Sequence, residues 1–223
     1  MWAGPATPAR GKKRVIPVLC LAVFTLVWLP LAIAPRNRAD WLLENLLTFA
    51  AVPVAVASYR KRPLSDAAYV QGTAFMILHT VGSHYTYSEV PAGDWLRDAF
   101  GLARNHYDRL VHFAFGLLML QPLRETVMRQ PERLAPLTAA WLSVAQILAC
   151  SAAYELIEWA VAAWVDPAAG TAYLGTQGDQ WDAQKDMACA AVGAVLAALR
   201  ELVTARGRAV AAHRHLRAGL GPR

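Results

Sequence analysis

The sequence contains few charged residues and few cysteines for its length. Of its 223 residues, 17% are charged and 56% are hydrophobic, which is more apolar than a typical soluble domain. The three cysteines, Cys20, Cys150 and Cys189, lie in apolar runs, where a thiol behaves as a small hydrophobic group. We therefore predict no disulfides, and the composition indicates a membrane protein.

Several familiar functional signatures are also missing. The sequence has no His-Glu-x-x-His motif, no Gly-x-Ser-x-Gly motif, no Walker motif and no visible internal repeat, so no reaction class follows from a short motif. Its basic residues, which give a net charge of +6, occur in short clusters between apolar runs instead of forming one basic stripe. We therefore predict no nucleic-acid partner.

Six apolar runs are long enough to cross a membrane, whose hydrocarbon core of about 30 Å requires about 20 helical residues. The first run resembles a secretory signal, but it is longer than the usual apolar region of about 7 to 15 residues, and cleavage would leave Pro35 as the first mature residue. We therefore interpret it as an uncleaved span. We predict an all-α bundle of six transmembrane helices over residues 15–203, with a cytoplasmic segment 1–14 and a basic cytoplasmic tail 204–223. The six runs cover approximately residues 15–34, 41–59, 67–84, 107–123, 137–164 and 183–203.

Lysine and arginine are distributed unevenly between alternate loops of this topology. The segments that would share the side of the N-terminus carry the basic clusters within 10–14, 60–62, 124–133 and 200–223. The segments on the other side hold Arg36, Arg38, Arg97 and Arg104. The positive-inside rule then predicts a multi-pass protein of the bacterial inner membrane with both termini in the cytoplasm.

Ionisable residues gather at the predicted outer ends of five of the six helices. Asp108 and His112 are four residues apart, as are Asp182 and Asp186, so the members of each pair share a helix face. Such a face should turn toward other helices or water instead of lipid. The candidate catalytic residues are His112, Asp108, Glu155, Glu158 and Asp186, and the candidate substrate-binding residues are His79, His84, Arg109, Asp182, Trp181 and Asp179.

These residue types can exchange protons or bind a divalent metal, for which His112, Glu155 and Asp186 are the candidate ligands. Whether a metal is the cofactor stays open from sequence. A different interpretation also stays open: acids at helix N-termini are typical of helix capping, and Arg109 and Lys185 could neutralise them in a structural ion-pair network.

The last apolar run contains two rows of small residues at four-residue spacing. The rows are Cys189, Gly193 and Ala197, and Ala190, Ala194 and Ala198. Small residues allow membrane helices to approach closely. We therefore expect this helix to pack tightly and its polar first turn to lie near its neighbours. We also expect the two long outer loops, rich in glycine, aromatic residues and acids, to cover the polar groups.

Four segments, in the order HTVGSHYTYSEVPAGDW, NHYDRLVHFAFGLL, YELIEW and GTQGDQWDAQKDM, resemble the YjdF-like family of bacterial inner-membrane proteins, whose activity is unassigned. More remotely, the layout is similar to VanZ-like membrane proteins, with departures near Ala190 and at Glu158. That similarity implies a cell-envelope role without supplying a reaction. Its matching positions here are Asp108, Arg109, His112, Phe113, Glu155 and Asp186.

Three functions are compatible with these features. The first is a membrane-embedded enzyme that acts from the outer face on a lipid-linked or cell-envelope substrate, with membrane lipid as its surroundings. The second is a non-catalytic scaffold or accessory protein held together by the polar layer. The third is a proton- or ion-linked transporter, which is less favoured because the charges lie on one side and no repeat is visible.

Overall fold

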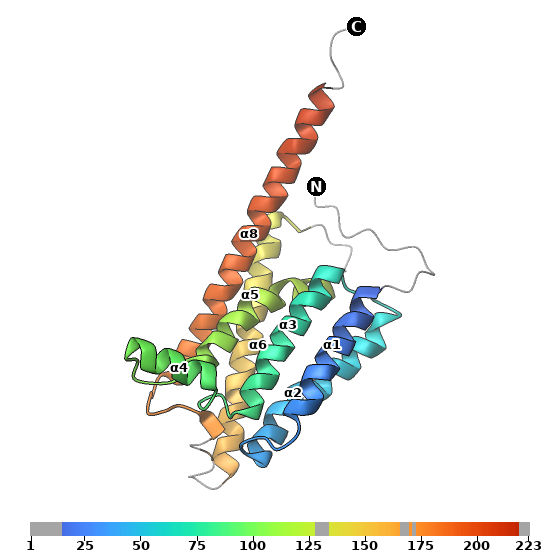
Figure 1. The fold of residues 1–223 in the computed structure, drawn as a ribbon. Helices are drawn as coiled ribbons and strands as arrows, with labels where there is room; N and C mark the ends of the chain where they lie inside the picture. The colour runs from blue at the N-terminus through green and yellow to red at the C-terminus, as the bar shows by residue number, and fades with distance from the viewer. Residues whose placement is uncertain (1–14, 128–133, 166–169, 171–172, 219–223) are drawn as a thin grey trace.

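The structure is a bundle of helices that lie side by side (Figure 1). The computed structural model describes residues 15–127, 134–165, 170 and 173–218, and these residues contain helices and no strand, which confirms the all-α prediction. The helices are α1 (Val15–Leu31), α2 (Arg38–Tyr59), α3 (Asp66–His84), α4 (Pro91–Phe100), α5 (Tyr107–Val127), α6 (Pro136–Trp164) and α8 (Asp182–Ala218).

Local sequence signals explain several helix boundaries. Asn37 caps α2 through its side-chain oxygen, which accepts the backbone N–H groups of residues 39 and 40. Ser65 caps α3 in the same way. Pro91 opens α4, where a missing N–H costs nothing, and Gly101 ends it with a positive φ of 61°, a conformation that glycine adopts without steric cost.

The long helices run alternately up and down the bundle. The ring Nδ1 of His84 lies 2.7 Å from the carbonyl oxygen of Leu31, so α1 and α3 end at the same level. Arg104, just before α5, pairs with Asp182 at the start of α8, which places both helix starts together. We call this level, where α1, α3 and α6 end and α2, α5 and α8 begin, the site end (Figure 1).

The opposite end of the bundle has polar contacts of its own. Glu125 of α5 accepts hydrogen bonds from the backbone N–H and the hydroxyl of Ser65, at 2.7 and 2.6 Å. Gln121 donates to both Ser65 and Glu125, and Arg124 pairs with Glu201. These contacts hold the start of α3 and the part of α8 around Glu201 against the end of α5.

Large apolar side chains are exposed on the long helices around the bundle. Examples are Leu26 of α1, Val54 of α2, Leu156 of α6 and Leu199 of α8. Apolar surface of this extent, on a protein whose interior is partly polar, is what lipid contact requires. Within the described residues, three helices are long and apolar enough to cross a membrane, namely α2, α6 and the Asp182–Thr204 part of α8.

The predicted count of six spans is therefore not confirmed, although the helical membrane class is supported. Helix α1 is apolar but has 17 residues. Helices α3 and α5 have 19 and 21 residues, yet neither is among the three candidate spans by length and composition. Both carry polar side chains, such as His79, Asp108 and Glu125, that lower their mean hydropathy. These side chains point into the bundle and are part of its polar interior.

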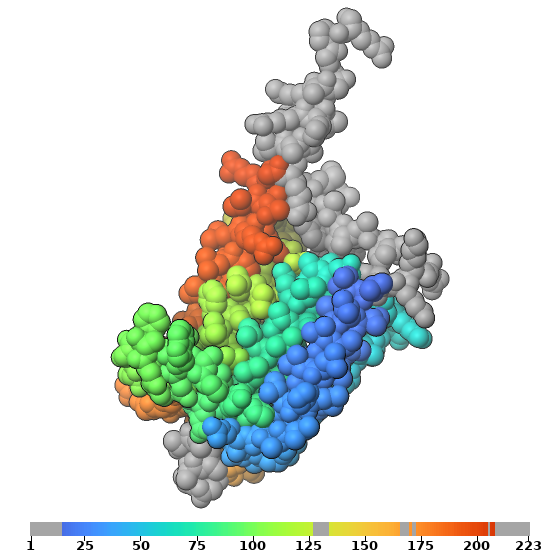
Figure 2. Space-filling view, in the orientation of Figure 1, coloured from blue at the N-terminus to red at the C-terminus, as the bar shows by residue number. Residues whose placement is uncertain are grey.

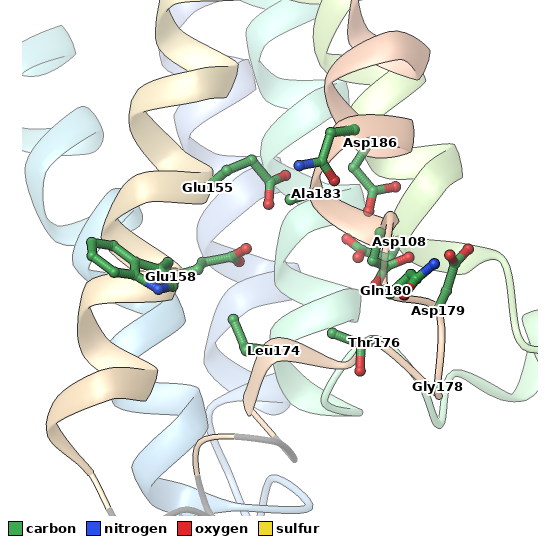
Figure 3. A pocket seen from close by; sticks show the side chains of 13 residues that line it. Asp108, Glu155, Glu158, Leu174, Thr176, Gly178, Asp179, Gln180, Ala183 and Asp186 are labelled. Atoms are coloured by element: carbon green, nitrogen blue, oxygen red, sulfur yellow. The ribbon is translucent and has the colours of Figure 1, made fainter.

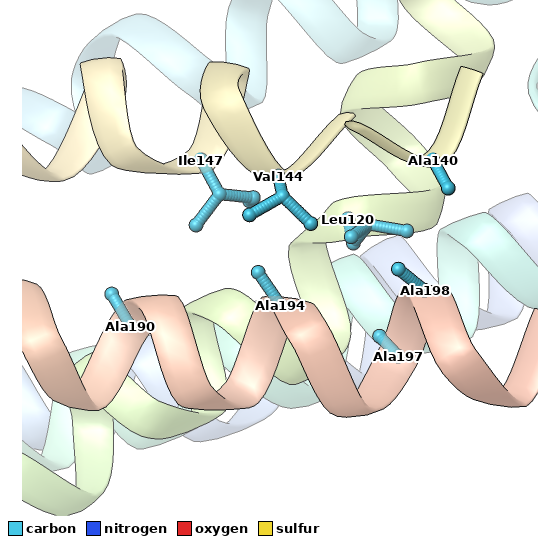
Figure 4. Close-up of a cluster of buried hydrophobic side chains, with 8 residues drawn as sticks. All are labelled: Leu120, Ala140, Val144, Ile147, Ala190, Ala194, Ala197 and Ala198. Carbon is cyan, nitrogen blue, oxygen red and sulfur yellow. The ribbon is translucent and has the colours of Figure 1, made fainter. Parts of the chain in front are cut away.

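The predicted close packing of α8 is confirmed (Figure 4). Ala190, Ala194 and Ala198 are buried against Ile147, Val144 and other apolar side chains of α5 and α6. On the α5 side, a Cβ atom at Gly193 would overlap the carbonyl oxygen of Phe113, and one at Gly116 would overlap the carbonyl oxygen of Ala190. The backbones of α5 and α8 therefore touch, as small residues permit.

Helix α4 stands out from the side of the bundle at the site end (Figure 2). It is strongly amphipathic, and Trp95 and Phe100 are among its exposed residues. Its other face is attached to the bundle through Asp94, which accepts a hydrogen bond from the buried Asn105. The predicted outer loop is thus partly helical and lies beside the site end.

Replacing Gly193 by alanine should destabilise the protein, because the new methyl group meets the backbone of α5, where overpacking costs about 1–3 kcal/mol. Gly72→Ala in α3 is the matched control, since a Cβ there meets no atom within 4 Å. Thermal unfolding in detergent should give a lower melting temperature for Gly193→Ala only. Equal melting temperatures for the two variants would contradict the close contact of α5 and α8.

Candidate functional site

A cavity of about 430 Å³ opens at the site end between α5, α6, α8 and the segment that precedes α8 (Figure 3). Glu155 and Glu158 extend from α6 toward α8, and Asp186 and Asp108 face them from the other side. The lining contains six carboxyl groups, those of Asp108, Glu155, Glu158, Asp179, Asp182 and Asp186. Such a wall is strongly acidic.

Three permanent cations contact these carboxyl groups within the described part of the chain. Arg104 donates from both terminal nitrogens to the two oxygens of Asp182, and both side chains are only 6% exposed. Arg109 donates to Asp179 at 2.6 Å and to Asp182 at 3.2 Å. Lys185 donates to Asp179 at 2.6 Å. The ion pairs therefore concentrate on Asp179 and Asp182.

Two groups beside α5 have pKa values that these contacts explain. Hydrogen bonds from Lys185, from the backbone N–H of Trp181 and from Arg109 hold the pKa of the Asp179 carboxyl well below its usual range. Burial, with help from Arg109, lowers the pKa of His106, whose Nδ1 lies 3.3 Å from the Arg109 guanidinium. A neutral His106 can therefore accept a hydrogen bond from Arg109.

Two of the remaining acids of the cavity, Asp108 and Glu155, lie beside His112, which is not itself part of the lining. The Nε2 atom of His112 is 3.4 Å from an oxygen of Glu155 and 3.6 Å from an oxygen of Asp108. These distances allow proton exchange after a small movement. Glu155 Oε1 and Asp186 Oδ1 are buried and receive no hydrogen bond. Asp186 Oδ1 lies 3.9 Å from Arg109 Nε, which is too long for a hydrogen bond.

Three carboxylates lie close enough to hold one metal ion. One oxygen each of Asp108, Asp182 and Asp186 lie within 4.8 Å of one another. This set shares Asp186 with the ligands predicted from sequence, while the other two predicted ligands, His112 and Glu155, form a contact with each other beside it. All of these residues were predicted as site residues, and the structure brings them together.

A second set of buried polar groups connects α2, α3 and α6 through hydrogen bonds. The hydroxyl of Tyr154 donates to Glu44 at 2.5 Å. The Nε2 atom of His79 lies 3.1 Å from the carbonyl oxygen of Glu44, so Nε2 carries the ring proton. The Nδ1 atom of His79 accepts a hydrogen bond from the Tyr87 hydroxyl at 2.5 Å. Burial raises the pKa of Tyr87 well above its ordinary value. His79 is therefore part of this set and does not line the cavity.

Four other predicted site residues are also outside the cavity lining. Arg109 and His112 contact lining acids, whereas His84 and Trp181 lie farther away. His84 faces the carbonyl oxygen of Leu31 and connects the ends of α1 and α3. Trp181 has an exposed side chain and contributes its backbone N–H to Asp179. Trp159 of α6 lines the cavity in its place.

The capping interpretation of the acids at helix starts is wrong for Asp182, because its carboxylate binds Arg104 and Arg109. At the start of α5 the side chain of Asn105 accepts the backbone N–H of Tyr107. The position of Asp182 at a helix start suggests that its carboxylate caps backbone N–H groups. Arg109 of α5 and Arg104, just before α5, bind the carboxylate instead.

Asn105 is a structural residue that sequence reasoning did not identify. It is fully buried, and its amide nitrogen donates to the carbonyl oxygen of Val90 and to Asp94, both at 3.0 Å. Its backbone N–H and C=O both pair with the side-chain amide of Gln177. These bonds join the two outer loops. Among the described residues, only the second loop contributes to the cavity lining, so the expectation that both loops cover the polar groups holds for that loop.

Arg104, Glu44 and Tyr154 were also absent from the predicted site. Arg104 looked like an ordinary loop arginine, since its partner Asp182 is 78 residues away. Tyr154 had a usable signal, because it lies four residues before Glu158 and one before Glu155 in the same polar stretch. Glu44 had the signal of an acid within an apolar run.

The fold and this site define a helical membrane protein with an acidic cavity at one end of its bundle. A model of the family described as "Predicted membrane protein (DUF2238)" matches residues 16–206, and the chain belongs to this family. It is 37% identical over 189 residues to "Inner membrane protein YjdF" of Escherichia coli (strain K12), covering 83% of this chain and 88% of that protein. No solved structure gives a significant match.

These comparisons confirm the resemblance drawn from the four sequence motifs. They also confirm the prediction of a membrane protein. The E. coli relative is named as an inner-membrane protein. The more remote similarity to VanZ-like proteins stays a prediction.

Replacing Arg104 by methionine should strongly destabilise the protein, because it leaves the buried Asp182 carboxylate short of its bidentate partner; breaking a buried pair in this way costs about 3–5 kcal/mol. Arg97→Met is the matched control, since its pairs with Asp94 and Asp98 are partly exposed and such pairs contribute about 0–1 kcal/mol. Melting temperatures in detergent measure both. A loss no larger for Arg104→Met than for Arg97→Met would contradict the structural role of the pair.

Proposed function

We propose that this protein is a multi-pass inner-membrane protein whose acidic cavity binds, and acts on, a lipid-linked or cell-envelope substrate. The observation that carries the proposal is the cavity with six carboxyl groups at one end of a bundle with an apolar outer surface. A cavity of this size can take a polar head group. Buried acids in a membrane protein mark functional positions by default.

The chemistry of the lining suggests what part of a substrate would enter. Each carboxyl group offers more acceptor positions than donors in either protonation state, so the cavity favours a head group rich in hydroxyl or amino donors. Trp159 lines the cavity and is 65% exposed, and Leu156 on the same helix is 62% exposed. An acyl or prenyl chain could lie along this apolar surface of α6 while its head group enters the cavity.

The acids around His112 suggest proton-transfer chemistry. Glu155 and Asp108 flank the ring of His112 at 3.4 and 3.6 Å, and Glu158 lies beside them in the lining. A histidine and carboxyl groups at such distances are suited to act as general acid and base on a bound head group. We therefore assign the catalytic roles to Asp108, His112, Glu155, Glu158 and Asp186, and substrate contacts to Arg109, Asp179 and Asp182.

A scaffold function has support from a different observation. Arg104 and Arg109 join α5 to α8 through Asp179 and Asp182, and Lys185 adds to this network. Ion pairs of this kind fix helix register without requiring a ligand. These ion pairs involve only two of the six carboxyl groups in the lining, however. We therefore favour the enzyme function over the scaffold function.

We further propose that both termini are cytoplasmic, with residues 1–14 and 204–223 flanking the six-helix domain 15–203. The segment 1–14 lies outside the described residues, and α8 continues without a break to Ala218. The basic cluster 60–62 lies at the opposite end of the bundle from the cavity. By the positive-inside rule this end faces the cytoplasm and the cavity faces outward.

Cysteine labelling should establish this orientation. In a variant that lacks Cys20, Cys150 and Cys189, a membrane-impermeant maleimide added to intact spheroplasts should label Glu89→Cys at the site end. It should label Lys61→Cys at the opposite end only after lysis, because that end faces the cytoplasm. The reverse pattern would contradict the orientation.

Glu155→Gln should abolish complementation of the envelope defects of a deletion strain, measured as sensitivity to detergents and cell-wall antibiotics, at unchanged protein abundance in the membrane. Removing a general acid or base lowers a rate by about 10²–10⁴-fold. Glu89→Gln, an exposed acid at the same end, should complement fully. Loss of complementation in proportion to a loss of abundance would support the scaffold function instead.

A further inference from the structure

We propose that the cavity holds a divalent cation of the magnesium, manganese or calcium class, bound by Asp108, Asp182 and Asp186. These ions bind oxygen ligands at about 2.0–2.6 Å, so two oxygens on one ion lie at most about 5 Å apart. One oxygen from each of the three carboxylates lies within 4.8 Å of the others. The three side chains, from α5 and α8, are thus spaced to share one ion.

A buried oxygen without a hydrogen bond is the second, independent observation. The side chain of Asp186 is only 3% exposed, and its Oδ1 receives no hydrogen bond. Arg109 Nε, which is also buried and makes no hydrogen bond, lies 3.9 Å from it. An unpaired buried carboxylate oxygen is costly. Figure 3 shows this carboxyl group pointing toward Asp108 within the cavity, where a cation would supply the missing partner.

The distribution of charge leaves room for the ion. The six acids of the lining contact three permanent cations in the described chain, and those contacts concentrate on Asp179 and Asp182. Asp182 receives three hydrogen bonds from Arg104 and Arg109, and a carboxylate has about four lone-pair sites. One position on Asp182 therefore remains for a metal, which it would share with the arginines.

The donor set indicates the class of ion. Asp108, Asp182 and Asp186 supply only oxygen, which hard cations prefer over the nitrogen and sulfur ligands of zinc or copper. Glu155 adds a further buried oxygen without a hydrogen bond on the facing helix. The Nε2 atom of His112 lies 3.6 Å from Asp108 and 3.4 Å from Glu155, so the nearby imidazole nitrogen faces these acids.

This inference deepens the proposed function, on which it rests for the role of the ion. A cavity lined by acids repels a phosphate group, whereas magnesium-type ions are commonly held by one or two carboxylates together with substrate phosphates. With the ion in place, the cavity could bind the phosphate or pyrophosphate of a lipid-linked substrate. Arg109, adjacent to the same carboxylates, would add a second positive contact.

The test uses the full-length protein in detergent, stripped with EDTA and titrated separately with Mg²⁺, Mn²⁺ and Ca²⁺. At least one ion should raise the melting temperature saturably, as ligands that bind only the folded state do. Electron paramagnetic resonance should count one bound Mn²⁺ per chain. Asp186→Asn should weaken binding at least tenfold, while Asp98→Asn, whose side chain is 71% exposed on α4, should bind as the wild type does.

The proposal is overturned if none of the three ions stabilises the wild type or if no Mn²⁺ binds stoichiometrically. It is also overturned if zinc binds in preference and is lost in His112→Ala. Should Asp186→Asn not fold, Asp108→Asn takes its place. The proposed function is judged separately by native mass spectrometry with E. coli polar lipid extract: a lipid held by the metal-free wild type and lost in Glu158→Gln would leave that function standing without the ion.

Discussion

Gly116 and Gly193 let the backbones of α5 and α8 touch, and the position of the acids in the cavity depends on that contact. Because neither residue has a side chain, the first turns of both helices lie close enough for Arg109 to reach Asp179 and Asp182. The alanine row of α8 then packs α6 against the same pair of helices. Larger residues would separate the helices and with them the carboxyl groups.

The polar interior divides into a paired and an unpaired half. In the paired half, Arg104, Arg109 and Lys185 satisfy Asp179 and Asp182 and fix the segment before α8. In the unpaired half, buried oxygens of Glu155 and Asp186 receive no hydrogen bond. Stability alone explains the first half, since each buried charge has a partner. The second half costs stability, which is the physical reason for placing the ligand there.

Sequence reasoning succeeded where one helix contains the whole pattern. The spacing of Asp182 and Asp186 predicted a shared face, and the small residues of the last helix predicted its tight packing, both of which hold in the structure. It failed for Arg104 and Asn105. Their distant partners, Asp182 at the start of α8 and Gln177 in the segment before it, are more than 70 residues along the chain. No local pattern indicates such a pairing. Hydropathy also gave six spans where three helices meet the criteria of length and composition.

The sequence by itself determined the membrane setting, the helical class and the family, because apolar length, small-residue spacing and ordered motifs are properties of contiguous residues. Only the tertiary structure decided which acids are neutralised and which stay unpaired. That outcome depends on distances between side chains of α5, α6, α8 and residues 173–181 before α8. Asp182 and Asp186 lie one helical turn apart, yet Arg104 binds the first, and the second retains a buried oxygen without a hydrogen bond.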